Sequence, residues 1–143
     1  MKLTSPDFKN NQQIPEKFSC DGKDVNPTLI IEDLPEGTKT LALIVDDPDA
    51  PAGTWIHWVV FNIRPTGKIE EDSIPGIQGR NDFKKLNYGG PCPPAGTHRY
   101  FFKLYALSSK LELEEGATKE ELEEVMQDTL IDKAELMGVY PKN

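Results

Sequence analysis

The sequence is poor in the residues that most often carry chemistry, with two cysteines, two histidines and two tryptophans among 143 residues. It has no apolar run near the roughly 20 residues that a membrane-spanning helix needs. Residues 1–15 are polar and lack the apolar stretch of a secretory signal. We therefore expect a cytoplasmic protein without a transmembrane segment, folded as one domain over residues 1–143.

Positive charge is also scarce. The chain has 16 Lys and Arg against 24 Asp and Glu, a net charge of −8. Affinity for nucleic acids comes mainly from Lys and Arg that neutralise phosphates, so this balance argues against a nucleic-acid-binding protein. The total charge does not fix the field inside one pocket, so a small anionic ligand stays open.

The two cysteines, Cys20 and Cys92, lie far apart and form no CxxC motif. In a reducing cytosol such residues are usually free thiols that pack as small hydrophobes. We expect this state here. A Cys20–Cys92 disulfide is the alternative, and a hyperthermophilic source would favour it.

Turn residues punctuate the chain, since 12 prolines and 11 glycines are scattered between short extended runs. The runs that predict strands cover residues 28–32, 40–45, 55–63 and 99–107. Residues 55–63 alternate between two apolar faces, with His57, Val59 and Phe61 on one and Trp58 and Val60 on the other. Such a pattern predicts a central strand that is covered on both sides. The Gly- and Pro-rich segment 73–94 is predicted to be a long ordered loop.

A helix is predicted at the C-terminal end. Thr118 and Glu121 match a capping box, and Gly138 could end the helix, with a proline following. An apolar stripe between these ends suits a helix that packs on the sheet; it comprises Leu122, Val125, Met126, Leu130, Ala134 and Met137.

Both histidines lie in predicted strands beside aromatic residues. His98 and Tyr100 share a strand face because side chains alternate along a strand. The stretch that begins Asp46-Asp47 follows directly on the apolar run 40–45, and a carboxylate at the end of a buried strand must face water, a cation or a ligand. The glycines of the segment 89–96 allow close backbone approach to an anion. Arg99 points away from His98 and is expected to pair with a carboxylate such as Asp49.

Three ordered motifs resemble the phosphatidylethanolamine-binding proteins, also called Raf kinase inhibitor proteins. They are Asp-Pro-Asp-Ala-Pro at 47–51, His-Trp-Val-Val at 57–60, and the stretch from Gly90-Pro91 to Gly96-Thr97-His98-Arg99-Tyr100. The Cys-Asp-Gly segment at 20–22 looks like the bacterial and archaeal branch. Cys92 departs from animal members, which have proline there and a longer C-terminus. The resemblance runs from about Leu3 to Tyr140.

The resemblance implies a mainly β fold with one large and one small antiparallel sheet, a C-terminal helix and peripheral helical turns. It also implies a phosphate-holding pocket at one end of the large sheet. By position, this pocket would be lined by Asp47, Asp49, His57, His98 and Tyr100, with the backbone around Gly90 to Cys92 as a wall.

These features favour non-catalytic binding of a small phosphate-bearing or zwitterionic ligand, without a cofactor. An ammonium could face Asp47 or Asp49 while Tyr100, a histidine and backbone N–H groups hold the phosphate. If a protonated histidine donates, binding should tighten between about pH 7.5 and 6.

Three alternatives remain. Two His and two Asp could hold a metal, although no HExxH spacing supports this. Cys92 near His98 could act as a nucleophile. The protein could also inhibit a kinase or protease through the pocket rim and the loop 73–87. The oligomeric state stays open, with a homodimer as one option.

Overall fold

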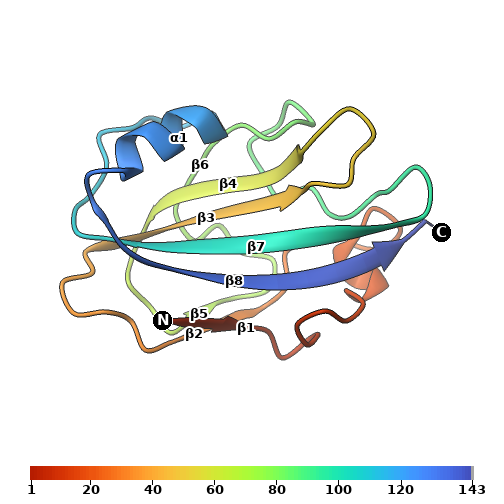
Figure 1. The fold of residues 1–143 in the computed structure, drawn as a ribbon, viewed down its shortest axis with the longest axis horizontal. Helices are drawn as coiled ribbons and strands as arrows, with labels where there is room; N and C mark the ends of the chain where they lie inside the picture. Colours follow the sequence, from red (N-terminus) through yellow and green to blue (C-terminus); the bar gives the residue numbers. More distant parts are fainter. Residues whose placement is uncertain (143) are drawn as a thin grey trace.

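The computed structural model describes residues 1–142 and consists mainly of two antiparallel sheets. The large sheet has the strand order β6-β4-β3-β7-β8 and the small sheet the order β1-β2-β5. The strands of the large sheet are β3 (Thr40–Asp47), β4 (Trp55–Ile63), β6 (Ile77–Gln78), β7 (Thr97–Leu107) and β8 (Leu130–Pro141). Those of the small sheet are β1 (Lys2–Thr4), β2 (Leu29–Glu32) and β5 (Lys68–Ile69). One 3₁₀ turn, η1 (Glu16–Phe18), and one helix, α1 (Lys119–Met126), complete the fold, as Figure 1 shows.

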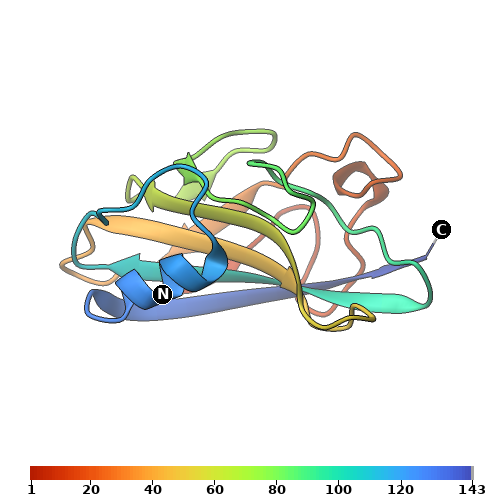
Figure 2. The same cartoon turned by 90° about the horizontal axis from the view of Figure 1, so that it is seen from above.

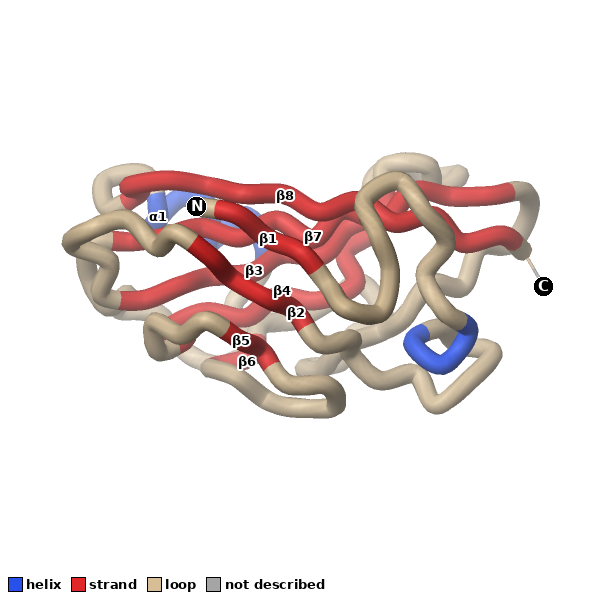
Figure 3. Tube along the Cα trace, turned by 90° about the horizontal axis from the view of Figure 1, so that it is seen from below, coloured by secondary structure: helices blue, strands red, loops and turns tan. Residues whose placement is uncertain are grey.

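The large sheet is covered on both faces. The small sheet lies across one face, and it is in front when the molecule is seen from below (Figure 3). Helix α1 covers the other face and is in front in the view from above (Figure 2). Each face therefore has its own apolar core, one containing Trp58 and Phe102 and the other containing Val59, Phe61 and Leu122.

Most of the predicted strands are confirmed. The run 55–63 forms β4, and both of its faces are buried as expected. The other three runs lie within β2, β3 and β7, or miss them by one or two residues at an end. The short strands β1, β5 and β6 were not predicted, because segments of two or three residues carry no readable alternation.

The predicted two faces of residues 55–63 are wrong in one respect. Val59 and Phe61 face the α1 side, whereas His57 lies with Trp58 on the side of the small sheet. The register explains the change: Asp46 pairs with Ile56 but Val45 pairs with Trp58, so β4 has an extra residue at this point. A β-bulge of this kind re-aims side chains and is frequent beside functional sites.

The predicted C-terminal helix is too long. It begins with the expected capping box between Thr118 and Glu121, but it ends at Met126. The residues that follow form the 12-residue strand β8, which pairs with β7 along its whole length. Gly138 is therefore a strand residue and not a helix cap. A Cβ atom there would lie 2.5 Å from Ile14, so glycine permits the chain segment before η1 to pack closely on β8.

The structure also overturns the expectation of free thiols. Cys20 and Cys92 form a disulfide. It links the turn after η1 to the loop before β7, which are 72 residues apart in sequence. Cys92 is consequently no free nucleophile in this structure, which removes the proposed pairing of its thiol with His98.

Candidate functional site

The neighbouring strand ends β3, β4 and β7 place polar side chains at one end of the large sheet. Asp47 ends β3, His57 lies near the start of β4, and His98 and Tyr100 lie near the start of β7. Antiparallel pairing of β3 with both β4 and β7 brings these ends together. All four side chains are on the side of the small sheet. Side chains alternate along β3 and β7 in the same phase, which places Asp47, His98 and Tyr100 on this face, and the bulge keeps His57 there.

These four residues line one cavity of about 280 Å³. The first residue of β4 adds the ring of Trp55, and loops provide the remaining walls with the ring of Phe83 and three prolines. The complete lining is Asp47, Ala50, Pro51, Trp55, His57, Phe83, Cys92, Pro93, Pro94, His98 and Tyr100. Small-ligand sites usually combine a mostly apolar wall with a few placed polar groups, and this cavity has that character.

The His98 ring is fixed by a carboxylate. Its Nδ1 lies 2.7 Å from Oδ2 of Asp47, and both residues are buried. Because an ionised carboxylate only accepts hydrogen bonds, Nδ1 of His98 carries the proton. The second ring nitrogen, Nε2, is then left for another partner.

A backbone carbonyl orients the other histidine. Nδ1 of His57 donates to the carbonyl oxygen of Gly89 at 2.6 Å. Burial lowers the pKa of His57, which favours the neutral ring. A neutral ring with a proton on Nδ1 has a lone pair on Nε2, so His57 offers an acceptor and not a cation.

Tyr100 has a polar group without a well-aligned partner. Its hydroxyl is buried and completes no hydrogen bond of good geometry within residues 1–142, although the Asp47 carboxylate and the Cys92 N–H lie near it. Burial raises the pKa of Tyr100, with the nearby Asp47 carboxylate acting in the same direction. The phenol therefore keeps its proton and can donate it in a hydrogen bond. Its ring also packs edge-to-face against His57, with 5.2 Å between the ring centroids.

Two residues expected at the site lie outside the cavity lining. Asp49 is bound by Arg99, whose Nε and Nη2 donate to its two carboxylate oxygens at 2.9 and 2.8 Å. This confirms the predicted ion pair, and the hydrogen bonds lower the pKa of Asp49 to about 2. Gly90 lies behind the wall, where its N–H donates to Asp24 at 2.7 Å. A Cβ at Gly90 would lie 2.2 Å from the Phe18 carbonyl oxygen, so the close backbone approach serves the fold.

Sequence reasoning missed the apolar part of the cavity. Trp55 could have been found, since it shares a strand face with His57 two residues later. Phe83 belongs to an irregular loop, and its edge-to-face contact with His57 has no periodic signal in the sequence. Pro51, Pro93 and Pro94 were recognised as turn residues but not as walls.

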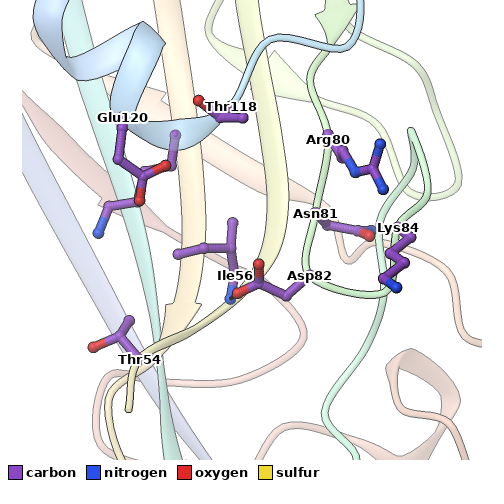
Figure 4. Close-up of a pocket in the computed structure, with 9 residues that line it drawn as sticks. Thr54, Ile56, Arg80, Asn81, Asp82, Lys84, Thr118 and Glu120 are labelled. Atoms are coloured by element: carbon purple, nitrogen blue, oxygen red, sulfur yellow. Dashed lines mark hydrogen bonds between the residues drawn. The ribbon is translucent and has the colours of Figure 1, made fainter. Parts of the chain in front are cut away.

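A larger hollow of about 480 Å³ lies on the α1 side of the large sheet (Figure 4). It is lined by charges of both signs, with Arg80 and Lys84 on one side and Glu120 on the other. Its Asp82 carboxylate accepts from the Ile56 N–H, and its Thr118 belongs to the capping box of α1. These polar groups already serve the fold, so this hollow is the weaker candidate.

No group of three or more His, Cys, Asp or Glu side chains within residues 1–142 is arranged to hold a metal ion. None of the helices in that range is long and apolar enough to cross a membrane.

Comparison with known proteins gives the family. The family model for "Phosphatidylethanolamine-binding protein" matches residues 4–141. The chain belongs to the phosphatidylethanolamine-binding protein family. It is 45% identical to a UPF0098 protein of Methanothermobacter thermautotrophicus, with 98% of each chain covered. It is 48% identical to a UPF0098 protein of Pyrococcus horikoshii, covering 94% of this chain and 74% of that protein.

Solved structures of family members have the same fold. One, from Chlamydia trachomatis, is described as a phosphatidylethanolamine-binding protein homolog; it has a TM-score of 0.96 at 44% identity and covers 99% of this chain and 97% of its own. Another, E. coli YbcL, is described as a member of the mammalian family; it has a TM-score of 0.91 at 32% identity, with coverage of 99% and 98%. The family assignment made from the three sequence motifs is therefore confirmed, and so is the mainly β fold with two antiparallel sheets.

Proposed function

We propose that the chain binds a small phosphate-bearing or zwitterionic ligand in the cavity between Asp47, His57, His98 and Tyr100, without a catalytic step. The observation that carries the proposal is the buried hydroxyl of Tyr100, which completes no hydrogen bond of good geometry within residues 1–142 and lies beside two imidazoles. Buried polar groups are nearly always hydrogen-bonded, so a donor left alone at a cavity wall points to a ligand that accepts its bond.

The hydrogen-bonding groups suit a phosphate monoester. Tyr100 donates to a phosphate oxygen, and Nε2 of His98 donates when that ring is protonated. Nε2 of His57 accepts, so it can receive the proton of a P–OH group or an ammonium N–H. The single carboxylate of the cavity, Asp47, is already bound to His98 and does not stand alone against an anion.

Zwitterionic ligands fit for a second reason. The cavity contains both acceptors and donors, and Trp55 and Phe83 provide aromatic faces that attract a cation. Asp49 does not face the cavity, so an ammonium would lie near Asp47, His57 or these rings. Phosphoethanolamine carries both charged groups and is the appropriate probe.

Calorimetric titration tests the proposal. Phosphoethanolamine should bind wild type, and Tyr100→Phe should weaken binding about 10- to 150-fold, because a hydrogen bond to a charged group contributes about 1.5–3 kcal/mol. Tyr105→Phe is the matched control, since Tyr105 lies on the same strand outside the cavity and should bind as wild type. Absence of binding to wild type, or equal binding by Tyr100→Phe, would refute the proposed site.

A second candidate is inhibition of a kinase or protease through the pocket rim and the loop 73–87. Three large apolar side chains of this loop are exposed, namely Ile74, Phe83 and Leu86, and of these Phe83 also lines the cavity. Exposed apolar surface is typical of interaction sites. A partner that docks there should compete with phosphoethanolamine. Enzyme inhibition that is insensitive to Ile74→Ser and Leu86→Ser would contradict this role.

The cytoplasmic location expected from the sequence stays a prediction, and the disulfide bears on it. Disulfides persist mainly in oxidising compartments and in intracellular proteins of hyperthermophiles. The location proposed is therefore a cytosol that tolerates such a bond. Alkylation of free thiols at the moment of cell lysis, followed by mass measurement, would test this.

A further inference from the structure

The disulfide lies at the cavity wall and joins two exposed residues. Cys92 lines the ligand cavity, and together with Cys20 it also lines a smaller neighbouring hollow of about 110 Å³. Both cysteine residues are exposed. Thiol–disulfide exchange requires that an attacking thiolate reach one of the two sulfur atoms, and the exposure of both residues favours this.

The chain on the Cys20 side is held independently of the disulfide. The buried Ser19 hydroxyl donates to the Glu16 carbonyl and contacts the Tyr140 hydroxyl at 2.9 Å. The Tyr140 hydroxyl in turn donates to Asp21. This part of the molecule should keep its shape when the bond is broken.

The wall just before Cys92 is also held by other bonds. The Cys20 N–H donates to the Pro91 carbonyl at 3.1 Å, and the Gly90 N–H donates to Asp24. Gly89 accepts from His57 and donates back to the His57 carbonyl at 2.9 Å. The wall is therefore fixed as far as Pro91 without help from the disulfide.

The wall after Cys92 is different. Pro93 and Pro94 line the cavity but have no N–H group to donate. Within residues 1–142, the next hydrogen bond between backbone groups along the chain is the one from Lys142 to the Gly96 carbonyl, at 2.7 Å, and the Cys92 N–H lies near the Tyr100 hydroxyl. The disulfide is thus the covalent anchor of the segment 92–95, which lies between Pro91 and the start of β7.

We propose that the Cys20–Cys92 disulfide is a thiol-exchange site, and that its reduction by a dithiol loosens the Pro93–Pro94 wall and weakens ligand binding. Reduction would thus regulate the ligand cavity, and its expected effect on binding rests on the proposed function.

The exchange balances without any further reactant. One thiolate of a dithiol protein attacks one sulfur of the disulfide, the S–S bond breaks, and a mixed disulfide forms. The second thiolate of the reductant then attacks the mixed bond. Cys20 and Cys92 leave as two thiols, each with a proton from solvent, and the dithiol becomes a disulfide. Two electrons have passed from the reductant to this chain, and an oxidant of the same disulfide class reverses the step.

The strand-borne part of the cavity should survive reduction. The His98–Asp47 hydrogen bond joins two strands, and neither residue is bonded to the segment 92–95. Reduction is therefore expected to lower affinity for phosphoethanolamine about 10-fold, the effect of ordering a mobile wall upon binding, and not to abolish it.

The experiment compares oxidised wild type, wild type reduced by a CxxC dithiol protein, and the double variant Cys20→Ser/Cys92→Ser. Alkylation and mass measurement count the thiols, with two per chain expected after reduction. Calorimetry measures phosphoethanolamine affinity, and hydrogen exchange of peptides covers residues 89–100. Circular dichroism checks that each form is folded. Tyr88→Phe is the control, because it removes the hydrogen bond from Tyr88 to the Phe18 carbonyl in the same loop and keeps the disulfide.

Faster exchange confined to the non-proline amides of residues 92–97, with about 10-fold weaker binding in the reduced and double-serine forms, supports the proposal. Tyr88→Phe should bind as wild type while oxidised and weaken on reduction. The proposal is overturned if the dithiol cannot reduce the folded protein, or if reduction leaves exchange unchanged. It is also overturned if the reduced protein binds as tightly as the oxidised one. If oxidised wild type does not bind phosphoethanolamine at all, the proposed function fails, while hydrogen exchange still decides whether the bond anchors the wall.

Discussion

The cavity is built in two different ways on its two sides. The floor consists of Asp47, His98 and Tyr100, which lie on paired strands β3 and β7. The wall consists of loop residues, among them Phe83 and Pro93, which no strand pairing holds. In a paired strand, the backbone hydrogen bonds of many neighbouring residues hold each side chain in position. A loop residue is held by only a few specific contacts. The floor should therefore resist single changes that the wall does not.

The difference also divides the chemistry. The floor and β4 supply the polar groups that can bind a charged ligand. The wall supplies shape and apolar surface through proline and aromatic side chains. Such a division is common, because polar groups must be placed precisely while apolar contact tolerates small displacements. A comparison of floor and wall variants is the direct way to test it.

The largest effect on stability is expected from the anchor of the wall. Cys20→Ser/Cys92→Ser removes a cross-link between positions 72 residues apart. In the chain-entropy account, this lowers the free energy of unfolding by about 4 kcal/mol. Urea denaturation with and without a reductant measures it. Equal stability of the oxidised wild type and the double variant would contradict a stabilising cross-link.

A smaller loss is expected when the floor is altered. Asp47→Asn replaces the carboxylate that orients His98 in a buried pair, and an imperfectly satisfied buried group costs about 1–3 kcal/mol. Denaturation measures the loss of stability, and phosphoethanolamine titration should show weakened binding.

The matched control for this floor variant is Asp49→Asn. This change breaks the ion pair with the exposed Arg99, where solvent screens the charges, so little change is expected. Similar losses from the two variants would contradict the distinction between a buried floor and a solvated rim.

The floor was largely predictable from the sequence and the wall was not. Side-chain alternation placed His98 and Tyr100, at the start of the predicted strand, on one face, and the carboxylates after the run 40–45 pointed to the same end of the sheet. The family motifs then linked these segments. Phe83 has no such signal, because an irregular loop has no period. The sequence favours free thiols over the disulfide, since two isolated cysteines do not by themselves indicate that they pair.

Residues 118–141 show where local patterns fail. The capping box at Thr118 predicted the start of α1 correctly. The apolar spacing of Leu130, Ala134 and Met137 also suits a helix, yet these residues belong to β8. Strand β7 offers a long edge for pairing, and this tertiary contact outweighs a helical preference of a few tenths of a kcal/mol per residue. The bulge beside His57 was equally invisible, because it is a property of the register between two strands.

The smallest expected effect concerns His57, which connects floor and wall through its bond to Gly89. Burial lowers its pKa, so between that lowered value and the ordinary value of about 6.5 the unfolded chain binds more protons than the folded one. The free energy of unfolding should therefore decrease as pH falls below about 6.5. The contribution of the ionised Asp49 carboxylate to the free energy of unfolding is lost only at much lower pH, because the pKa of Asp49 is about 2.

His57→Gln should lose this part of the pH dependence, so the difference in unfolding free energy between wild type and variant should shrink as the solution is acidified from about pH 7 to 5. His98 is present in both proteins and cancels in the comparison. Parallel curves would mean that burial does not disfavour the His57 cation.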